Sequence, residues 1–370
     1  MNPAKLTKDT VLVILISVFM LILINLLLTT TYSIIYNLRD SNRYNLLPDP
    51  AKNNYSHMSE DDVNTLLSNT WHHSWVYEQV LGFKEAPRTT QFVNVNKFGI
   101  RDNKSEDGFI ASLNNSIWFF GGSTTFGYGV ADHETIPAHL ANILKSEVIN
   151  LGRGYYFSAQ ENLFMLELLR SGYRPEKAIF LDGLNEKCSI KTYQNEMRLL
   201  FASAQKSHTT PLEYTIDIIR PTLELSENII RLLEIINTSN NSKRTTMAQN
   251  NRLTALNCSG YGSQLKLPEV LDHNLKHRSA ICNKFNIPCT TFVQPFAGVH
   301  GKYTTPELLR VSKKQLLNRF NQLKPIFDQH GATSVTSALD KHPNHAFIDN
   351  VHYSAEASFL IAKQISNHLR

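Results

Sequence analysis

The stretch Ile117-Trp118-Phe119-Phe120-Gly121-Gly122-Ser123-Thr124-Thr125-Phe126-Gly127 joins an apolar segment to two glycines, a serine and two threonines. The apolar residues predict a buried strand, and the glycines predict a sharp turn where that strand ends. Such a turn can expose the next side chain, Ser123, at the carboxyl end of the strand, where a hydroxyl can act as a nucleophile. The pattern also fits a glycine-rich β-turn with a solvated Ser/Thr cluster, so the rest of the chain has to decide between these interpretations.

Short apolar segments alternate with helical segments from residue 117 onward. The strands are predicted at residues 117–120, 147–151, 178–181, 290–293 and 333–335, and the helices at residues 135–144, 159–169, 271–285 and 306–329. This alternation is typical of an α/β fold with a parallel sheet covered on both faces. In such sheets, ligands bind at the carboxyl ends of the strands. The alternation lapses at about residues 187–268, which predicts an insertion that could form a lid over the site.

Four short pieces at predicted strand ends supply what an acyl transfer needs: a nucleophile, a base, a group that orients the base, and oxyanion donors. Ser123 supplies the nucleophile and His352 the base. Asp349 stands three residues before His352, so one loop can hold both side chains. The backbone N–H groups of Ser123 and Gly152 and the carboxamide of Asn185 are the candidate donors. Each piece alone is more typical of a turn or a helix cap, but the four in this order favour a catalytic site.

The order and content of these pieces resemble the SGNH, or GDSL-type, hydrolase superfamily, whose four blocks carry Ser, Gly, Asn and His, with an Asp three residues before the His. The resemblance covers the chain from about residue 117 to its end. It implies a flavodoxin-like three-layer α/β/α sandwich with about five parallel strands. It also implies a catalytic triad and an oxyanion hole, the latter formed by Ser123, Gly152 and Asn185. The implied triad is Ser123, Asp349 and His352.

Two positions depart from the usual blocks of this superfamily. Gly122 replaces the Asp of the first block, and Glu186 replaces the Asp that usually ends the third, which keeps a carboxylate there. The form Gly-Gly-Ser-Thr-Thr-Phe-Gly resembles a subgroup of membrane-anchored or exported members, often concerned with surface glycans. An ordinary α/β-hydrolase is disfavoured, because Thr125 stands where the motif G-x-S-x-G requires its last glycine.

Three polar residues after strand ends are candidates to line a substrate pocket, although ordinary loop polarity explains them equally well: Arg153, Tyr155 and Gln294. We expect no metal and no cofactor, because this chemistry needs none. Several histidines also lack the carboxylate spacing of a metal site: His133, His300, His342 and His345.

Residues 11–28 form an almost unbroken apolar run, interrupted by Ser17 and Asn25. Its length predicts an uncleaved transmembrane anchor over residues 11–31. A cleaved signal peptide and a buried helix are the alternatives, but the Thr- and Tyr-containing sequence that follows is a poor cleavage site. Lys5 and Lys8 precede the run, so residues 1–10 are predicted to be cytoplasmic and the body of the protein to lie outside, in the periplasm, at the cell surface or in a lumen. Residues 32–110 then form a linker with a small β lead-in, and residues 111–370 the hydrolase-like domain.

The composition excludes some partners and leaves the redox state open. The chain has 370 residues and a net charge of +5, with no basic block that would favour nucleic-acid binding. Its four cysteines have no C-x-x-C spacing, which argues against a zinc ribbon. They fit one or two disulfides or buried thiols equally well. The sequence makes no prediction about the oligomeric state.

The interpretation that unites these observations is a membrane-anchored extracytoplasmic serine esterase. It would remove acyl groups, with O-acetyl on a cell-surface glycan as the expected substrate, through an acyl-enzyme on Ser123. An O-acyltransferase that acylates a polysaccharide would use the same triad. A lipase or thioesterase is suggested by the anchor, and a non-catalytic glycan-binding module would keep the fold without turnover.

Overall fold

The computed structural model describes part of residues 9–34 and then residues 43–47, 49–71, 75–102, 104–187, 265–301, 313–342 and 345–369. The chain divides into two units, one of Met1–Asn42 with Gln205–Ala248 and one of Arg43–Ala204 with Gln249–Arg370. In the first unit, the described residues between 9 and 34 are helical. Within the residues described, no helix combines the length and the apolar character that crossing a membrane requires. Most of the predicted insertion at 187–268 lies outside the described residues.

The second unit is built on a five-stranded parallel sheet with the strand order β6-β5-β7-β8-β9. This order confirms the flavodoxin-like α/β fold. It places β5 between β6 and β7, so the direction of winding reverses at β5. The strands span Ile117–Gly121 (β5), Val148–Gly152 (β6), Lys177–Asp182 (β7), Cys289–Val293 (β8) and Thr333–Ser334 (β9).

The sheet is buried on both faces, and the apolar run that begins β5 explains why. Trp118 and Phe120 point to one face, and Ile117 and Phe119 to the other, because successive side chains of a strand alternate. All five residues of β5 are buried. A strand with two apolar faces needs helices on both sides, as the alternating sequence predicted.

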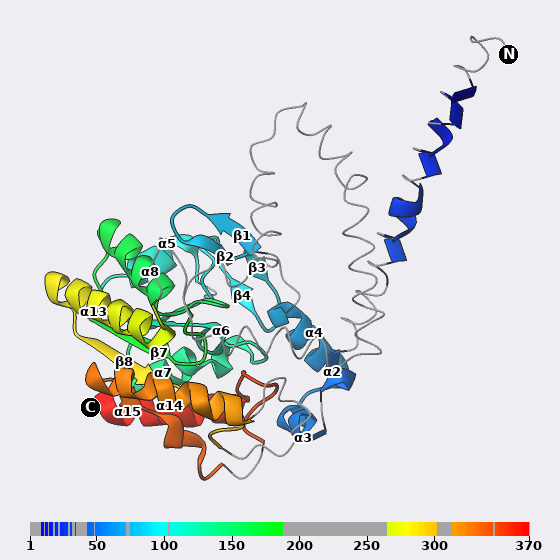
Figure 1. The fold of residues 1–370 in the computed structure, drawn as a ribbon. Coiled ribbons are helices and arrows are strands. Elements are labelled where there is room, and N and C mark those ends of the chain that lie inside the picture. The colour runs from blue at the N-terminus through cyan, green and yellow to red at the C-terminus, as the bar shows by residue number, and fades with distance from the viewer. Residues whose placement is uncertain are drawn as a thin grey trace. The chain divides into compact units, whose positions relative to one another are not determined.

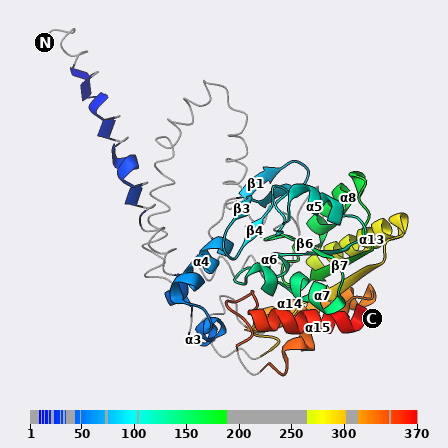
Figure 2. The same ribbon diagram turned by 180° about the vertical axis from the view of Figure 1, so that it is seen from behind.

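Helices cover the sheet in two layers, which gives the expected α/β/α sandwich (Figures 1 and 2). The face with Trp118 and Phe120 packs against α8 and α13, and the opposite face packs against α7 and α15. α14 packs against α13 through leucine and phenylalanine side chains. The helices span Glu106–Ser112 (α5), Ile136–Leu144 (α7), Ser158–Arg170 (α8), Leu267–Phe285 (α13), Lys313–Gln329 (α14) and Ala355–Leu369 (α15). Short 3-10 helices lie at Asp132–Glu134 (η2) and Thr336–Leu339 (η6).

From Arg43 onward, the segment predicted as linker and β lead-in packs in the second unit. Its helix α4 (Glu60–Trp71) buries a stripe at helical spacing, Val63, Leu66, Leu67 and Thr70. This stripe joins a cluster with Phe126, Tyr128 and Ile348, which flank the predicted site. The other elements of the segment are α2 (Arg43–Leu46), α3 (Asp49–Lys52), η1 (Asn53–Tyr55), the hairpin of β1 (Trp75–Glu78) with β2 (Gly82–Glu85), and the pair of β3 (Arg88–Thr89) with β4 (Asn94–Val95).

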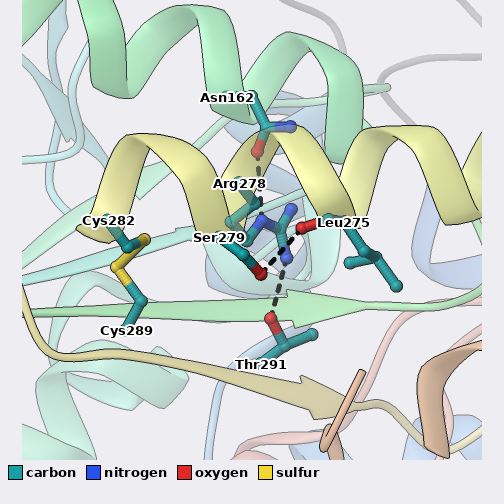
Figure 3. The surroundings of a disulfide bond; sticks show 7 residues. All are labelled: Asn162, Leu275, Arg278, Ser279, Cys282, Cys289 and Thr291. Carbon is teal, nitrogen blue, oxygen red and sulfur yellow. Dashed lines mark hydrogen bonds between the residues drawn. A yellow bond between two sulfur atoms is a disulfide. The ribbon is translucent and has the colours of Figure 1, made fainter. Parts of the chain in front are cut away.

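A disulfide joins Cys282, in the last turn of α13, to Cys289 at the start of β8 (Figure 3). Their Cα atoms are 6.1 Å apart, within the usual range for this bond. The bond therefore decides for this pair between the disulfide and the buried thiols that the sequence left open. Cys188 and Cys258 lie outside the described residues.

Candidate active site

Ser123 begins the short helix α6 (Ser123–Phe126) immediately after β5, and Gly122 is the N-cap of that helix. Both preceding glycines allow close approaches. A Cβ on Gly121 would lie 2.1 Å from Thr125 Oγ1, and a Cβ on Gly122 would lie 2.2 Å from Asn185 Nδ2. The turn was expected to expose Ser123, but only 8% of that residue is exposed. The turn therefore directs the hydroxyl toward another residue of the chain more than toward open solvent.

That partner is His352. Its Nε2 lies 2.8 Å from Ser123 Oγ, and its Nδ1 lies 2.7 Å from Asp349 Oδ2. The second carboxylate oxygen of Asp349 accepts backbone N–H bonds from Val351 at 2.7 Å and from His352 at 2.6 Å. The structure thus brings the three predicted triad residues into one hydrogen-bonded series.

The surroundings of Asp349 favour its charged form. Burial opposes ionisation of the carboxyl, but the charge of His352 and the hydrogen bonds from His352 and Val351 outweigh it. Together they hold the pKa of Asp349 below its usual value. An ionised Asp349 can keep the proton of His352 on Nδ1, which leaves Nε2 as the acceptor for the serine proton.

Asn185 lies beside the nucleophile, in the turn after β7. Its carboxamide Nδ2 donates to Tyr156 O at 3.1 Å and occupies the space that a side chain on Gly122 would need. The amide has two hydrogens, so one bond leaves the second for an oxyanion. The oxyanion role of Asn185 stays a prediction, and its position next to Gly122 is compatible with it.

Gly152 ends β6 and is paired with Gly121 in the sheet. A Cβ at Gly152 would lie 2.3 Å from Phe126 N, so a glycine lets α6 pack directly on β6. Its backbone N–H donates to Asn150 Oδ1 at 3.1 Å. An oxyanion could accept this N–H only in competition with the Asn150 side chain, so the predicted oxyanion role of Gly152 has a cost that the sequence did not reveal.

Gln294 is buried beside the predicted oxyanion donors, and its role in a substrate pocket stays a prediction. A small cavity next to the nucleophile has Gln294 in its wall, together with Gly122 and Asn185. Gln294 is 3% exposed, and its Oε1 accepts a hydrogen bond from Thr124 Oγ1 at 2.8 Å. The residue after the nucleophile is therefore tied to this wall.

The prediction that Arg153 lines the substrate pocket is wrong. Arg153 is 1% exposed, and its guanidinium bonds to Glu78, to Tyr156 Oη at 3.0 Å and to Phe98 O at 3.1 Å. It also lies over the ring of Phe164, 3.9 Å from the centroid. The buried guanidinium holds the N-terminal β segment onto the sheet domain through both of its terminal nitrogens, which leaves it buried away from a substrate.

Tyr155, the third pocket candidate, is 41% exposed and does not line the cavity beside Ser123. Its φ of 65° is in the left-handed region, which few non-glycine residues adopt. The ring lies 5.8 Å from the ring of Trp75, and Lys187 Nζ lies 5.9 Å from its centroid. Tyr155 thus stands on the surface, one residue from the Tyr156 carbonyl that holds Asn185.

Buried charges lie behind the turn that carries Asn185. Arg278 of α13 donates to Asp182 Oδ2 at 2.5 Å and to Glu161 Oε2 at 3.1 Å. Glu186 bonds to the Ser158 hydroxyl at 2.6 Å. Burial, followed by the charge of Asp182, raises the pKa of Glu186 to about 7. The sequence identified Glu186 only as a departure from a motif, and no local pattern pointed to Arg278.

Two aromatic residues that the sequence did not identify contact the predicted base. The ring of Tyr128 is stacked on His352, with centroids 5.2 Å apart and an interplanar angle of 18°. The ring of Trp71 meets His352 at 84°, with centroids 5.5 Å apart. Trp71 ends the helix α4 and precedes His352 by most of the chain, so no spacing in the sequence could have linked them.

No protein-family model and no curated protein matches the chain. Among solved structures, a carbohydrate acetylesterase family member from Sinorhizobium meliloti matches with a TM-score of 0.38 and 10% identity, covering 69% of this chain and 97% of the other. A lipase/acylhydrolase from Enterococcus faecalis matches with a TM-score of 0.36 and 13% identity, covering 69% and 96%. An aryl esterase from M. smegmatis matches with a TM-score of 0.34 and 11% identity, covering 69% and 98%.

These TM-scores are below 0.5, so the interpretation of the site rests on its own distances. A serine at a strand end, a histidine on its hydroxyl and an ionised aspartate on that histidine are the groups that nucleophilic acyl transfer requires. The chain thus carries the active-site arrangement of a serine hydrolase.

Proposed function

We propose that the chain is a serine esterase of the SGNH type that works through an acyl-enzyme. The observation that carries the proposal is the continuous series Ser123 Oγ, His352 and Asp349, with separations of 2.8 and 2.7 Å. In this series, His352 Nε2 takes the hydroxyl proton while Ser123 Oγ attacks the ester carbonyl. The proton then passes to the departing alcohol oxygen as the C–O bond breaks. Water then attacks the acyl carbon while His352 Nε2 takes its proton, and that proton returns to Ser123 Oγ as the bond to the acyl group breaks and the acid leaves.

The tetrahedral intermediate carries a negative oxygen that needs hydrogen-bond donors. The Ser123 N–H stands at the first position of α6, where an α-helix leaves its N–H groups without intrahelical partners. The second hydrogen of Asn185 Nδ2 complements it, and the Gly152 N–H joins only after it leaves Asn150. Each such donor typically contributes about 3–4 kcal/mol to transition-state stabilisation.

The proposed substrate is an O-acetyl group on a cell-surface glycan, and the support for it is the resemblance of the Gly-Gly-Ser-Thr-Thr-Phe-Gly block to a subgroup concerned with such glycans. We further propose a membrane anchor at residues 11–31, a cytoplasmic N-terminus and a catalytic domain outside the cytoplasm. The apolar run of residues 11–28 supports the anchor. The disulfide Cys282–Cys289 supports the location, because such bonds persist mainly in oxidising compartments.

The test is labelling of the full-length protein by a fluorophosphonate probe, together with acetate release from aryl acetates. We expect Ser123→Ala to abolish both and Ser337→Ala to leave both unchanged, since the described bond of the Ser337 hydroxyl is to the Gln364 side chain of α15 and not to a triad residue. A wild-type protein that neither labels nor turns over would refute the esterase. A protein that labels, but turns over only when a sugar acceptor is added, would identify an O-acyltransferase instead.

A further inference from the structure

We propose that Trp71 and Tyr128 are positioning residues that clamp the imidazole of His352 and set its orientation toward Ser123. The inference rests on the proposed function, because it assigns these rings to the base of that reaction. Tyr128 lies nearly parallel to the imidazole, and Trp71 lies nearly perpendicular to it. The two aromatic rings also touch each other, with centroids 5.9 Å apart and planes at 80°. The three rings therefore form one contiguous group.

The hydrogen bonds of His352 leave one motion unrestrained. Bonds at Nδ1 and Nε2 fix the imidazole along the line from Asp349 to Ser123. They do not prevent the ring from tilting about that line. A ring stacked on the imidazole face and a second ring against it restrict this tilt, which is the motion that misaligns Nε2 with the serine hydroxyl.

Tyr128 is held in register with the nucleophile by the backbone. The N–H groups of Gly127 and Tyr128 both donate to Ser123 O, at 2.9 and 3.1 Å. At its other end, the Tyr128 hydroxyl donates to Glu85 Oε1 at 3.2 Å, and Tyr128 is only 6% exposed. The backbone of Tyr128, whose ring stacks on His352, is thus hydrogen-bonded to Ser123, the residue that His352 deprotonates.

Trp71 is delivered by a helix that docks on a single glycine. Gly129 N–H donates to Thr70 Oγ1 at 3.2 Å, and the Tyr55 hydroxyl donates to Gly129 O at 2.8 Å. Gly129 has a φ of 81°, and a Cβ there would lie 2.8 Å from Trp71 Cη2. The N-terminal segment therefore hydrogen-bonds to both the N–H and the carbonyl of Gly129. Because Gly129 has no side chain, the Trp71 ring can approach the imidazole.

The two rings also affect the charge on the base. His352 becomes a cation in the transition state, and an aromatic face stabilises a nearby cation. Among the described residues, the titratable groups around the imidazole are Asp349 on its own loop, Tyr128 after α6, Tyr55 from η1, and Glu85 from β2 behind the Tyr128 hydroxyl. A leucine at position 128 removes the aromatic face and keeps an apolar side chain over His352, so it isolates the electrostatic contribution of the ring.

The experiment compares Trp71→Leu and Tyr128→Leu with their conservative partners Trp71→Phe and Tyr128→Phe in the full-length protein. With an aryl acetate, we expect each leucine variant to lower kcat about tenfold with KM within about twofold. The acid limb of kcat/KM is expected to move down by about half a pH unit. Tyr128→Phe should have wild-type kcat and a wild-type pH profile, because it keeps the stacked ring although it loses the bond to Glu85.

Val63→Ala is the matched structural control. Val63 is buried in the same cluster on α4, and truncating it loosens the packing of the helix while both rings remain in place in the sequence. The clamp predicts an unchanged pH profile for this variant. The inference is overturned if Val63→Ala reproduces the changes of Trp71→Leu, or if both leucine variants keep the wild-type kcat and pH profile.

A second readout needs no turnover. The imidazole of His352 is followed by NMR in protein labelled at histidine, with His352→Gln to assign it and with Ser123→Ala as a parallel background. The clamp predicts ring-current-shifted imidazole protons in the wild type, and a loss of this shift in Tyr128→Leu. Unchanged imidazole resonances in both leucine variants would overturn the inference. If the wild type fails to label, the esterase proposal falls, while these resonances still decide whether the rings hold His352.

Discussion

Gly122→Ala is the substitution whose effect on catalysis can be worked out most directly. Gly122 has a φ of −85°, which an alanine adopts without left-handed strain, so the backbone itself should tolerate the change. The added Cβ would lie 2.2 Å from Asn185 Nδ2, whereas ordinary contacts begin at 3.4 Å. The carboxamide must then move by 3.4 − 2.2 = 1.2 Å, away from its 3.1 Å bond to Tyr156 O.

A displacement of this size is large for an oxyanion donor. Misplacing a catalytic group by about 1 Å costs roughly a hundredfold in rate, and losing a donor costs about a hundred- to a thousandfold. We therefore expect Gly122→Ala to lower kcat for an aryl acetate about a hundredfold. KM and the melting temperature should change little, because the ground-state ester and the core are not affected.

A double-mutant cycle with Asn185→Ala separates this cause from others. If the alanine acts only by displacing the carboxamide, Gly122→Ala should have almost no further effect once Asn185 is already alanine. Stopped-flow measurement of acylation for the wild type, both single variants and the double variant provides the numbers. Wild-type kcat in Gly122→Ala would refute the steric argument, and additive losses in the double variant would show that Asn185 is not the group displaced.

Three further predictions concern stability. The raised pKa of Glu186, about 7, means that its protonated form stabilises the fold below pH 4.5 and that this contribution is lost as pH rises through about 7. The melting temperature of Glu186→Gln should therefore depend less on pH across this window than that of the wild type. Parallel curves of melting temperature against pH would contradict the assignment. Replacing Cys282 and Cys289 by serine opens a loop of sequence separation 7 and should cost about 2–3 kcal/mol of unfolding free energy in urea titrations. A wild-type urea midpoint that does not change on reduction of the disulfide would contradict this prediction. Arg153→Met should cost about 3–5 kcal/mol of unfolding free energy, because it leaves Glu78 without its buried partner, while KM stays near the wild-type value. A change in KM without a loss of stability would indicate that Arg153 contacts the substrate after all.

The sheet could be predicted from the sequence because its signals are local. The apolar run before Gly121 is long enough to be a strand and too short for a helix, and glycines or turns bound the other strands in the same way. The predicted strand at 117–120 and the observed β5, Ile117–Gly121, differ by one residue. Asp349 and His352 were also predictable as a pair, because three residues of separation allow one loop to hold both.

The rest depended on contacts that the chain makes only after folding. Arg153 follows a strand end like a pocket residue, but the N-terminal β segment accepts hydrogen bonds from both terminal nitrogens of its guanidinium. The spacing that makes the Gly152 N–H a candidate donor does not show that the Asn150 side chain, two positions away, reaches back to accept it. Trp71 belonged to a segment that looked like a linker. In each case the partner was fixed by tertiary packing, which periodicity and spacing do not encode.

The position of Asn185 depends on groups well beyond the triad. Asp182 ends β7, three residues before Asn185, and its carboxylate is held by Arg278. Arg278 also donates to Thr291 Oγ1 of β8 at 3.0 Å, and it stands one helical turn before Cys282 on α13 (Figure 3). The disulfide fixes that end of α13 to β8, so it limits the sliding of the helix that would withdraw Arg278 from Asp182. A buried carboxylate without its arginine is costly, so α13 and the β7 end are held together by more than apolar packing. The turn that presents the Asn185 carboxamide is therefore supported from behind by a buried ion pair, and that pair in turn by a covalent bond.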